Sequence, residues 1–369
     1  YFQPFSRRTD MSQAVYQQLL EVMQKRGGAY AGLDVPEFFE MVEEMFNPDE
    51  AEVNNAMPRG PFTADTMAET MEKGRDAVEK VLESMANKGL CMAYKADDVQ
   101  YYMSARFMPG ILEFQFMAGT TTDRDKKIAK LIHAYEAVYD AKTPVKEGSF
   151  PLTRVITVDK TIETGNKIHT YDQVQTYIDN NDIIAVSECY CRHAALLRGE
   201  ESHGMPNDVC MQLGAGAQFA IERLGARKLN KQEARELLDR AEDAGLIHMS
   251  QNSAEGIGFI CNCDRWDCSP VTNALRHSKP GLYFNSGFDP LINADECTAC
   301  ETCIDRCPPE AMVLGEDDVP VINFDLCFGC AVCATGCPSE AITMTNKPEY
   351  VAPPGTAKEM IAALKASKA

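Results

Sequence analysis

Eight of the fifteen cysteines in this 369-residue chain fall into two runs with the same spacing. The first run reads CTACETCIDRCPPEA from residue 297, and the second reads CFGCAVCATGCPSEA from residue 327. Both follow C-x2-C-x2-C-x3-C-P, and each cysteine of the second run lies thirty residues after its counterpart. Three thiolates from one loop and a fourth from elsewhere suit the four irons of a cubane. Zinc ribbons instead use two CxxC pairs, so the pattern predicts two [4Fe–4S] clusters.

The ligands of each predicted cluster follow from how such runs are used in two-cluster ferredoxins. There the fourth cysteine of each run binds the cluster of the other run. The first cluster then takes Cys297, Cys300, Cys303 and Cys337. The second cluster takes Cys327, Cys330, Cys333 and Cys307. Residues 291–347 closely resemble the bacterial-type two-cluster ferredoxins, and this resemblance implies a domain that conducts electrons without transforming a substrate.

The charge of the chain restricts its partners. Its formal net charge is −19 at pH 7, and acidic residues such as Asp295, Glu301, Asp317 and Asp318 surround the two runs. Nucleic acid and anionic membranes are disfavoured as main partners, because both require clusters of lysine and arginine. The charge favours docking on a basic redox partner protein, such as another subunit of a complex.

Six further cysteines lie upstream of the two runs. They are Cys189, Cys191, Cys210, Cys261, Cys263 and Cys268. The motifs CYC and CNC each place two thiols two residues apart, and residues i and i+2 of a strand face the same way. Both motifs end apolar stretches that read as strands, so the pairs are expected to meet at one metal, with the other two arriving from loops. We expect a third iron–sulfur cluster here; structural zinc and unliganded thiols are the alternatives.

Most of residues 12–347 resemble a family of iron–sulfur proteins of anaerobic bacteria and archaea. The resemblance rests on CYCR at 189–192, Cys210, FICNC at 259–263 and the two ferredoxin runs. That family is described only as iron–sulfur binding, so the resemblance implies electron transfer and no named reaction. Many of its members carry extra cysteines after CNC, where this chain has Asp264, Trp266 and Asp267 before Cys268.

Polar and aromatic residues beside these motifs have predicted roles at the six-cysteine site. Trp266, the only tryptophan, is expected to shield the site from water. Arg192, His193 and Arg198 follow the first pair of thiols. They are candidates for hydrogen bonds to a cluster or an anionic substrate, with a purely structural role as the alternative.

The N-terminal part, residues 11–142, reads as a helical domain with a small hairpin. Apolar spacing predicts helices over 12–28, 35–46, 63–71, 74–89 and 123–141. The stretches CMAYK and VQYYMSA predict a hairpin that turns at residues 96–98. Helices followed by a hairpin resemble a winged helix, but the acidic surface argues for docking rather than DNA binding. Cys91 is expected to be a small buried hydrophobe.

The fold class that follows is α+β with several domains. Residues 150–285 read as an α/β domain that carries the additional cysteine cluster, 290–347 as the 2[4Fe–4S] ferredoxin domain, and 348–369 as a tail. GAGAQFA at 214–220 is taken as a helix start, because it lacks a third glycine and no clear strand precedes it. The opening YFQ is either the remainder of a cleaved tag or part of a native extension before Met11, so residues 1–10 are left out of the prediction.

Together these features predict an iron–sulfur electron-transfer protein, a subunit that relays electrons within an anaerobic oxidoreductase complex. The first alternative is a reductase with a substrate-accessible cluster at the six-cysteine site, and the second is a redox-sensing regulator. No residue is assigned a catalytic role. The sequence contains no run of 18 apolar residues, so no membrane-spanning helix is predicted. Clustered cysteines favour metal over disulfides, which indicates a reducing compartment, the cytoplasm by default. The N-terminal domain is expected to dock the partner or a second copy of the chain.

Overall fold

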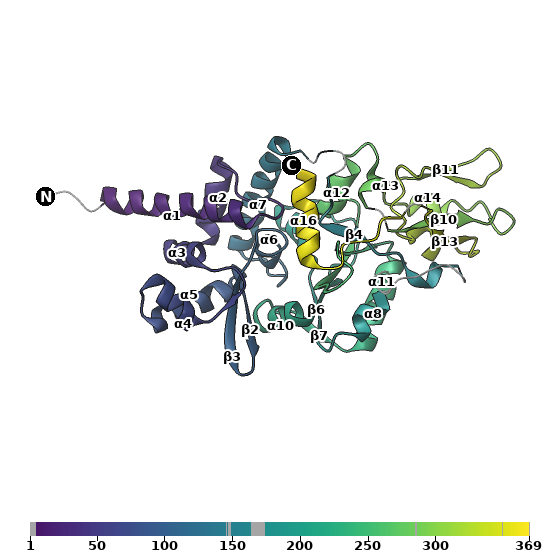
Figure 1. The fold of residues 1–369 in the computed structure, drawn as a ribbon. Helices are drawn as coiled ribbons and strands as arrows, with labels where there is room; N and C mark the ends of the chain where they lie inside the picture. Colours follow the sequence, from purple (N-terminus) through teal and green to yellow (C-terminus); the bar gives the residue numbers. More distant parts are fainter. Residues whose placement is uncertain are drawn as a thin grey trace. The chain divides into compact units, whose positions relative to one another are not determined.

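The computed structural model describes residues 5–144, 146, 149–163, 174–284, 286–348 and 350–368 (Figure 1). The chain divides into two compact units. The first comprises Tyr1–Pro144, His193–Glu201 and Gln218–Ala226, and the second comprises Val145–Arg192, Ser202–Ala217 and Arg227–Ala369. All the cysteines with a predicted metal role lie in the second unit, whereas Cys91 lies in the first.

Helices dominate the first unit. They are α1 (Phe5–Arg26), α2 (Pro36–Met45), α3 (Pro48–Ala56), α4 (Ala64–Met71), α5 (Arg75–Asn87), α6 (Ile111–Phe114) and α7 (Asp123–Lys142). The five helices predicted from apolar spacing are confirmed. The sequence prediction missed α3, although Asn47 and Glu50 form a capping box at its start. Its apolar pattern is weak because two of its buried side chains are Glu50 and Asn54.

A small sheet completes the first unit. Its strands β1 (Pro61–Phe62), β2 (Cys91–Ala96) and β3 (Val99–Ser104) lie in the order β1-β3-β2. The predicted hairpin is confirmed: Asp97 and Asp98 both have positive φ, at 49° and 61°, as a two-residue type I′ turn requires. Cys91 is fully buried, as expected. The winged-helix character of this unit and its docking role both stay predictions.

The second unit is built on a six-stranded sheet in the order β4-β8-β9-β6-β5-β7. The strands are β4 (Thr153–Val155), β5 (Ile184–Ser187), β6 (Cys210–Leu213), β7 (Arg227–Leu229), β8 (Ile247–Gln251) and β9 (Phe259–Cys263). Every neighbouring pair is antiparallel, so the prediction of an α/β domain is wrong in this respect. The sequence prediction missed β6 and β8, and these strands supply the antiparallel neighbours of β5 and β9.

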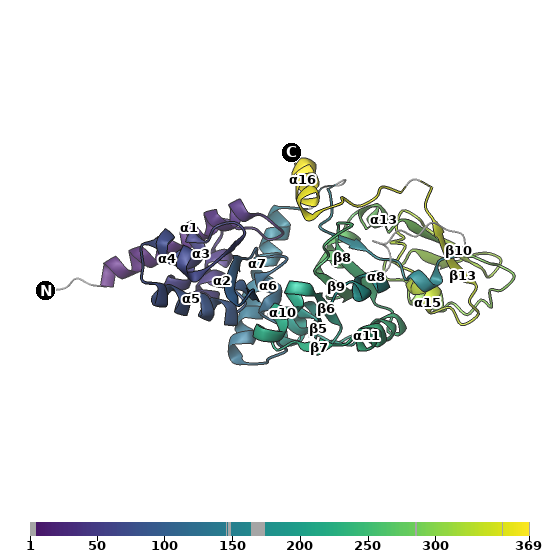
Figure 2. The ribbon, with the colours of Figure 1, turned by 60° about the horizontal axis from the view of Figure 1, so that its bottom comes forward.

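Helices of the second unit pack on this sheet or follow it. They are α8 (Val174–Asp179), α9 (Tyr190–Arg198), α10 (Gly214–Arg223), α11 (Lys231–Asp243), α12 (Ser269–Leu275), α13 (Pro280–Tyr283) and α16 (Ala357–Lys368), with a 3-10 turn at Asp159–Thr161. The division between the two units passes through α9 and α10. α11 lies against α8 and β7 (Figure 2), and its Leu237 and Leu238 join Met211 and Ile260 in one apolar core.

Three further sequence predictions are changed or limited by this description. The predicted tail is helical over α16. A strand, β6, does precede GAGAQFA, but the sheet around it is antiparallel rather than the parallel βαβ unit of a dinucleotide fold. The stretch YDQVQTYIDNN at 171–181 also predicts a helix from its sequence; this helix is present as α8, and residues 171–173 lie outside the described part.

The ferredoxin-like segment repeats its backbone as well as its sequence. β10 (Phe288–Ile292) pairs with β13 (Ile342–Asn346), and β11 (Met312–Leu314) pairs with β12 (Pro320–Ile322). The short helices α14 (Thr302–Asp305) and α15 (Val332–Thr335) lie thirty residues apart. Positive φ angles recur at the same offset, in the pairs Ala299 and Gly329, Glu301 and Ala331, and Glu310 and Glu340. The predicted boundary between a central and a ferredoxin domain, near residue 286, falls inside the second compact unit; the separate domains stay a prediction.

Candidate metal centres

A first, small cavity is lined by Cys297, Cys300, Cys303 and Cys337. Cys303 is buried, Cys297 and Cys337 are half-buried, and Cys300 is exposed. The hydroxyl and the backbone N–H of Thr302 donate to the Cys300 sulfur and lower its pKa, which favours the thiolate that a metal binds. These four side chains are the ones that the sequence assigns to the first cluster. Their binding of iron stays a prediction.

A second, small cavity is lined by Cys307, Cys327, Cys330 and Cys333. All four side chains are buried, and burial raises the pKa of each thiol, that of Cys307 to about 11. The backbone N–H of Ala311 donates to Cys307 Sγ at 3.2 Å, and that of Gly329 donates to Cys327 Sγ at 3.4 Å. Backbone donors around sulfur are typical of iron–sulfur sites, where they help to set the potential.

The backbone at Gly329 shows why this cavity needs a glycine there. Its φ is 64°, and a Cβ would lie 2.1 Å from the carbonyl oxygen of Phe288. The equivalent residue of the first run, Ala299, has the same handedness of backbone with a φ of 54°. The two cavities therefore share a backbone plan, but the cysteines of the second are more deeply buried.

The six upstream cysteines come together in the second unit. Cys261 and Cys263 lie on β9 with one residue between them, as predicted. Cys210 opens β6, whereas a loop was expected, and the β6–β9 register places it beside Cys261. Cys268 is the N-cap residue of α12.

The CYC pair lies where a strand gives way to a helix. Cys189 follows β5, and Cys191 is in the first turn of α9, so the expectation of a pair at i and i+2 of a strand is wrong here. β5 ends at Ser187, whose partner in β6 is Cys210. The chain leaves the sheet after this pair and enters α9. The pair nevertheless reaches the thiols of β9.

The six thiols form a continuous row in which each thiol perturbs the pKa of the next. Its order is Cys189, Cys191, Cys268, Cys263, Cys261 and Cys210. Three of the six are buried and three are half-buried. Over the described ranges, no three His, Cys, Asp or Glu side chains are grouped so that they could hold a single metal ion, either in the two cavities or among these six thiols. We call this set the six-cysteine pocket.

A buried ion pair borders the six-cysteine pocket. Arg192 Nη1 donates to Asp264 Oδ2 at 2.6 Å, and its two terminal nitrogens also donate to the carbonyl oxygen of Asn262. The side chains are 5% and 1% exposed. Burial lowers the pKa of Arg192, but Cys189 and Asp264 together raise it above its usual value. Arg192 Nε is buried and lacks a hydrogen-bond partner among the residues described. A positive charge with a spare donor suits a pocket that holds an anionic group.

Asp264 also shapes the loop that delivers Cys268. Its Oδ1 accepts hydrogen bonds from the backbone N–H groups of Trp266 and Asp267, at 2.9 and 2.7 Å. The Trp266 side chain is 45% exposed and stacks on His203 at 4.6 Å between ring centroids. The expectation that this tryptophan shields the site is therefore wrong, because the loop turns it outward.

The other two candidate side chains belong to the first unit and have partners there. His193 Nε2 donates to the carbonyl oxygen of Thr120 at 2.8 Å. Arg198 forms an ion pair with Glu200. Of the three basic residues named from the sequence, Arg192 belongs to the same unit as the six cysteines.

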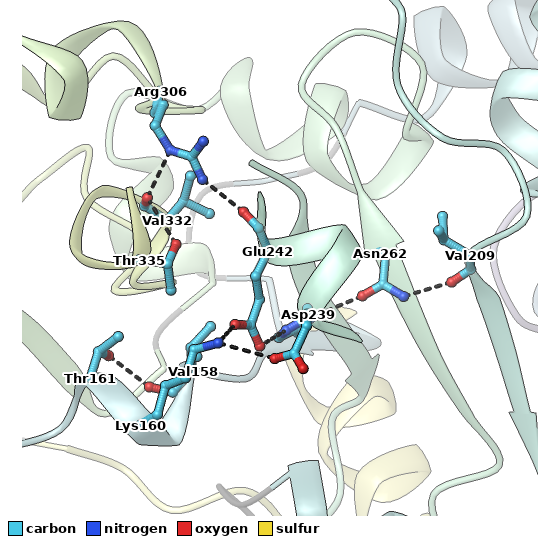
Figure 3. A network of polar contacts seen from close by, with 11 residues as sticks. Val158, Lys160, Thr161, Val209, Asp239, Glu242, Asn262, Arg306, Val332 and Thr335 are labelled. Carbon is cyan, nitrogen blue, oxygen red and sulfur yellow. Dashed lines mark hydrogen bonds and ion pairs between the residues drawn. The ribbon is translucent and has the colours of Figure 1, made fainter. Parts of the chain in front are cut away.

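A polar network that the sequence did not predict reaches the same pocket (Figure 3). Asn262, between the two cysteines of β9, donates from Nδ2 to the carbonyl oxygen of Val209 at 2.6 Å. Its Oδ1 therefore faces His248 Nδ1, at 2.6 Å, and His248 Nε2 lies 3.2 Å from Glu242 Oε1. Lys160 pairs with Glu242 and Asp239. The one sequence signal for this network is a polar residue in the middle of a buried strand.

Glu242 remains ionised inside this network. Burial raises the pKa of its carboxyl group, but His248 and Lys160 lower it further, so that the net shift is downward. The backbone of the same residue also accepts a hydrogen bond from the ferredoxin-like segment: Arg306 Nη2 donates to the Glu242 carbonyl oxygen at 2.7 Å (Figure 3). The network thus connects residues beside the cysteines of β9 with a residue of the first ferredoxin run.

Two apolar clusters connect the three cysteine sites. One contains cysteines of both cavities, namely Cys303, Cys307, Cys327 and Cys333, with Cys337 packed against it. The other contains Cys330 of the second cavity together with Cys263 and Cys268 of the six-cysteine pocket. Phe284 and Phe328 belong to this second cluster and meet edge to face at 5.3 Å.

Comparison with known proteins supports the iron–sulfur interpretation for part of the chain. Residues 320–343 match the family described as 4Fe-4S binding domain, a match that includes Cys327, Cys330, Cys333 and Cys337. The chain therefore carries a 4Fe-4S binding domain, which indicates a role in electron transfer. No curated protein matches the sequence. Among the helices described, none has the length and apolar character that a membrane span requires.

Proposed function

We propose that this chain is an electron-transfer protein with three iron–sulfur clusters, and that it acts as a subunit of a cytoplasmic anaerobic oxidoreductase complex. One [4Fe–4S] cluster binds in each of the two cavities, with the ligands assigned above. The third binds among the cysteines of the six-cysteine pocket. The observation that carries the proposal is the lining of the cavities: each holds three cysteines of one run and the fourth of the other.

Three observations support the third cluster. The six thiols are neighbours although they come from four segments of the chain. Reduced thiols this close to one another would be prone to oxidation if they bound nothing. Arg192 also offers a buried positive charge and an unpartnered Nε–H, which suit an anionic cluster and its sulfurs.

The surface around the first cavity supports a basic redox partner. Cys300 is exposed, and the flanking Asp295, Glu296 and Glu301 are exposed as well. Cations are absent from the described stretch 291–305, which strengthens the acidic character of this face. A partner with a basic surface would associate faster with such a face, and the effect would weaken at high salt.

A reductase remains the second candidate, because one side of the six-cysteine pocket reaches the surface. Cys189, Cys191 and Cys261 are half-buried, and six thiols exceed the four that a cubane requires. Turnover of a small oxidised substrate by the isolated protein with an artificial reductant would favour this function over simple relay.

Spectroscopy of the anaerobically purified protein tests the proposal. We expect a broad absorption near 400 nm, approximately as for thiolate-bound cubanes, that bleaches with dithionite and returns with a one-electron acceptor. Cys91→Ser is the matched control, because this cysteine lies apart in the first unit and its loss should leave the spectrum unchanged. A protein that stays colourless after reconstitution with iron and sulfide would contradict the proposal.

A further inference from the structure

One position breaks the internal repeat of the ferredoxin-like segment. Arg306 and Gly336 lie thirty residues apart and occupy the same place, the C-cap of α14 and of α15, with φ of −82° and −95°. A Cβ on Gly336 would lie 2.1 Å from Arg306 Nε. The backbone of Gly336 suits any residue, so the close approach of Arg306 is what requires glycine there. The two repeats therefore meet at this pair, with the side chain of one filling the space that the other leaves.

The guanidinium group of Arg306 joins the repeat to the cysteine-bearing sheet. Nη2 donates to the carbonyl oxygen of Glu242 at 2.7 Å (Figure 3), and Nη1 donates to that of Asp243 at 3.0 Å, both at the C-terminal end of α11. Nε donates to the carbonyl oxygen of Val332 at 3.3 Å, directly before Cys333. A cation at a helix C-terminus is favourable for its last carbonyl groups.

The far side of this contact is the polar network of the six-cysteine pocket. The Glu242 side chain reaches His248, which reaches Asn262 between Cys261 and Cys263. Arg306 thus holds the ferredoxin-like segment to the end of α11. From there, Glu242 and His248 form hydrogen bonds that lead to Asn262, between the two cysteines of β9.

The contact between the ferredoxin-like segment and the cysteine-bearing sheet gives the two predicted ferredoxin clusters different surroundings. Cys330 of the second cavity shares an apolar cluster with Cys263 and Cys268. The first cavity has the exposed Cys300 instead, and the apolar cluster that contains its Cys303 includes, among the described residues, none of the six upstream cysteines.

We propose that Arg306, seated over Gly336, fixes the order of electron transfer as first cavity, second cavity, six-cysteine pocket. This inference rests on the proposed function. A one-electron redox protein with a basic surface reduces the exposed first cluster. With clusters bound by the cysteines assigned above, the electron would pass from the first cavity to the second and from there to the six-cysteine pocket, and each centre would be reoxidised by the next. Arg306 is a positioning residue, because it touches none of the reacting atoms.

Rapid mixing of the fully loaded chain with limiting dithionite, followed by freeze-quench EPR, tests this order. The phase whose rate is independent of protein concentration reports transfer between centres. Arg306→Gln should slow it roughly tenfold, the effect of about one net charge-assisted hydrogen bond, with unchanged iron content. Gly336→Ala should do the same by displacing the guanidinium group. Arg306→Lys should recover part of the rate, and the exposed Arg276→Gln is the matched control.

Magnetic coupling between centres separates this inference from the proposed function. In Cys303→Ser, which lacks the first cluster, the EPR signals of the second and third centres should remain coupled. In Cys333→Ser the third centre should give an uncoupled signal. The reverse result, or unchanged kinetics in both Arg306→Gln and Gly336→Ala, would overturn the order while three centres remain. A chain with only about eight irons would overturn the proposed third cluster and the order together.

Discussion

Replacing Asp264 with alanine should strongly destabilise the six-cysteine pocket. The change leaves the Arg192 guanidinium group buried without its carboxylate, in a pair whose side chains are 5% and 1% exposed. Removing one partner of a buried ion pair costs about 3–5 kcal/mol. The variant also removes the acceptor of the Trp266 and Asp267 N–H groups, but this loop is partly exposed and water replaces that acceptor at small cost.

Hydrogen exchange of the β6 and β9 amides, followed in the full-length protein, measures the stability that Asp264→Ala loses. A change of about 3–5 kcal/mol speeds exchange roughly a hundred-fold to several thousand-fold where exchange follows unfolding of the strands. The matched control is Asp208→Ala, which breaks the Arg240–Asp208 pair at 2.9 Å with side chains 48% and 50% exposed. An exposed pair contributes about 0–1 kcal/mol, so the control should change exchange less than about fivefold.

A cluster bound in the six-cysteine pocket should change how much stability Asp264→Ala costs. An anionic cluster supplies part of the countercharge for Arg192, so Asp264→Ala should cost less in the iron-loaded protein than in the iron-free protein. Pairing it with Arg192→Met should recover much of the stability, because a buried charge is then no longer left alone. If Asp264→Ala speeds amide exchange no more than the Asp208→Ala control does, in both the iron-loaded and the iron-free protein, the Arg192–Asp264 pair does not stabilise the pocket and the reasoning is refuted.

Three other outcomes follow from the same structure. Cys303→Ser and Cys333→Ser should each remove about four irons per chain by quantitative iron analysis, and unchanged iron in either would contradict the ligand assignment. Gly329→Ala should remove only the second cluster, because its Cβ meets a backbone carbonyl oxygen, whereas Ala299→Gly should retain all iron; equal iron contents would refute the steric argument. Burial raises the pKa of Asp125, but its hydrogen bonds in the capping box of α7 lower it further, so its contribution is complete above the unfolded pKa of about 3.9 and is lost as the pH falls through the lower folded value. Asp125→Asn should therefore weaken α7 by about 0.5–2 kcal/mol at neutral pH, with wild type and variant converging in acid when α7 exchange is compared; a constant difference at all pH values would contradict it.

Much of the fold could be predicted because local patterns determine it. Apolar spacing places the helices of the first unit, and a pair of aspartates with positive φ makes the predicted hairpin turn. The ferredoxin runs repeat so closely that even their left-handed backbone positions recur. What the sequence could not reveal depends on contacts between distant segments. β6 and β8 are as long as β5 and β9, the strands that lead to the cysteine motifs, but their pairing with distant segments decides the type of sheet.

In the candidate site, too, local sequence patterns could be predicted, whereas contacts between distant segments could not. Clustered cysteines are visible in the sequence, and the structure brings all six upstream thiols together. Asp264, His248 and Arg306 were not predicted as parts of this site, because no spacing marks them and their partners lie far along the chain. Trp266 was misjudged for a related reason: a large apolar side chain next to a cysteine need not face it when the loop is held by backbone hydrogen bonds.

Metal analysis of the full chain, purified without oxygen, tests the central claim most directly. Three clusters require about twelve irons per chain, four for each cubane, with little zinc. EPR of the reduced protein should then show a third interacting centre, and substituting Cys261 and Cys263 together should lower the iron content by about four while both ferredoxin clusters remain. About eight irons together with about one zinc, lost in the same double variant, would instead show that the six-cysteine pocket is a structural zinc site and that the chain carries two clusters.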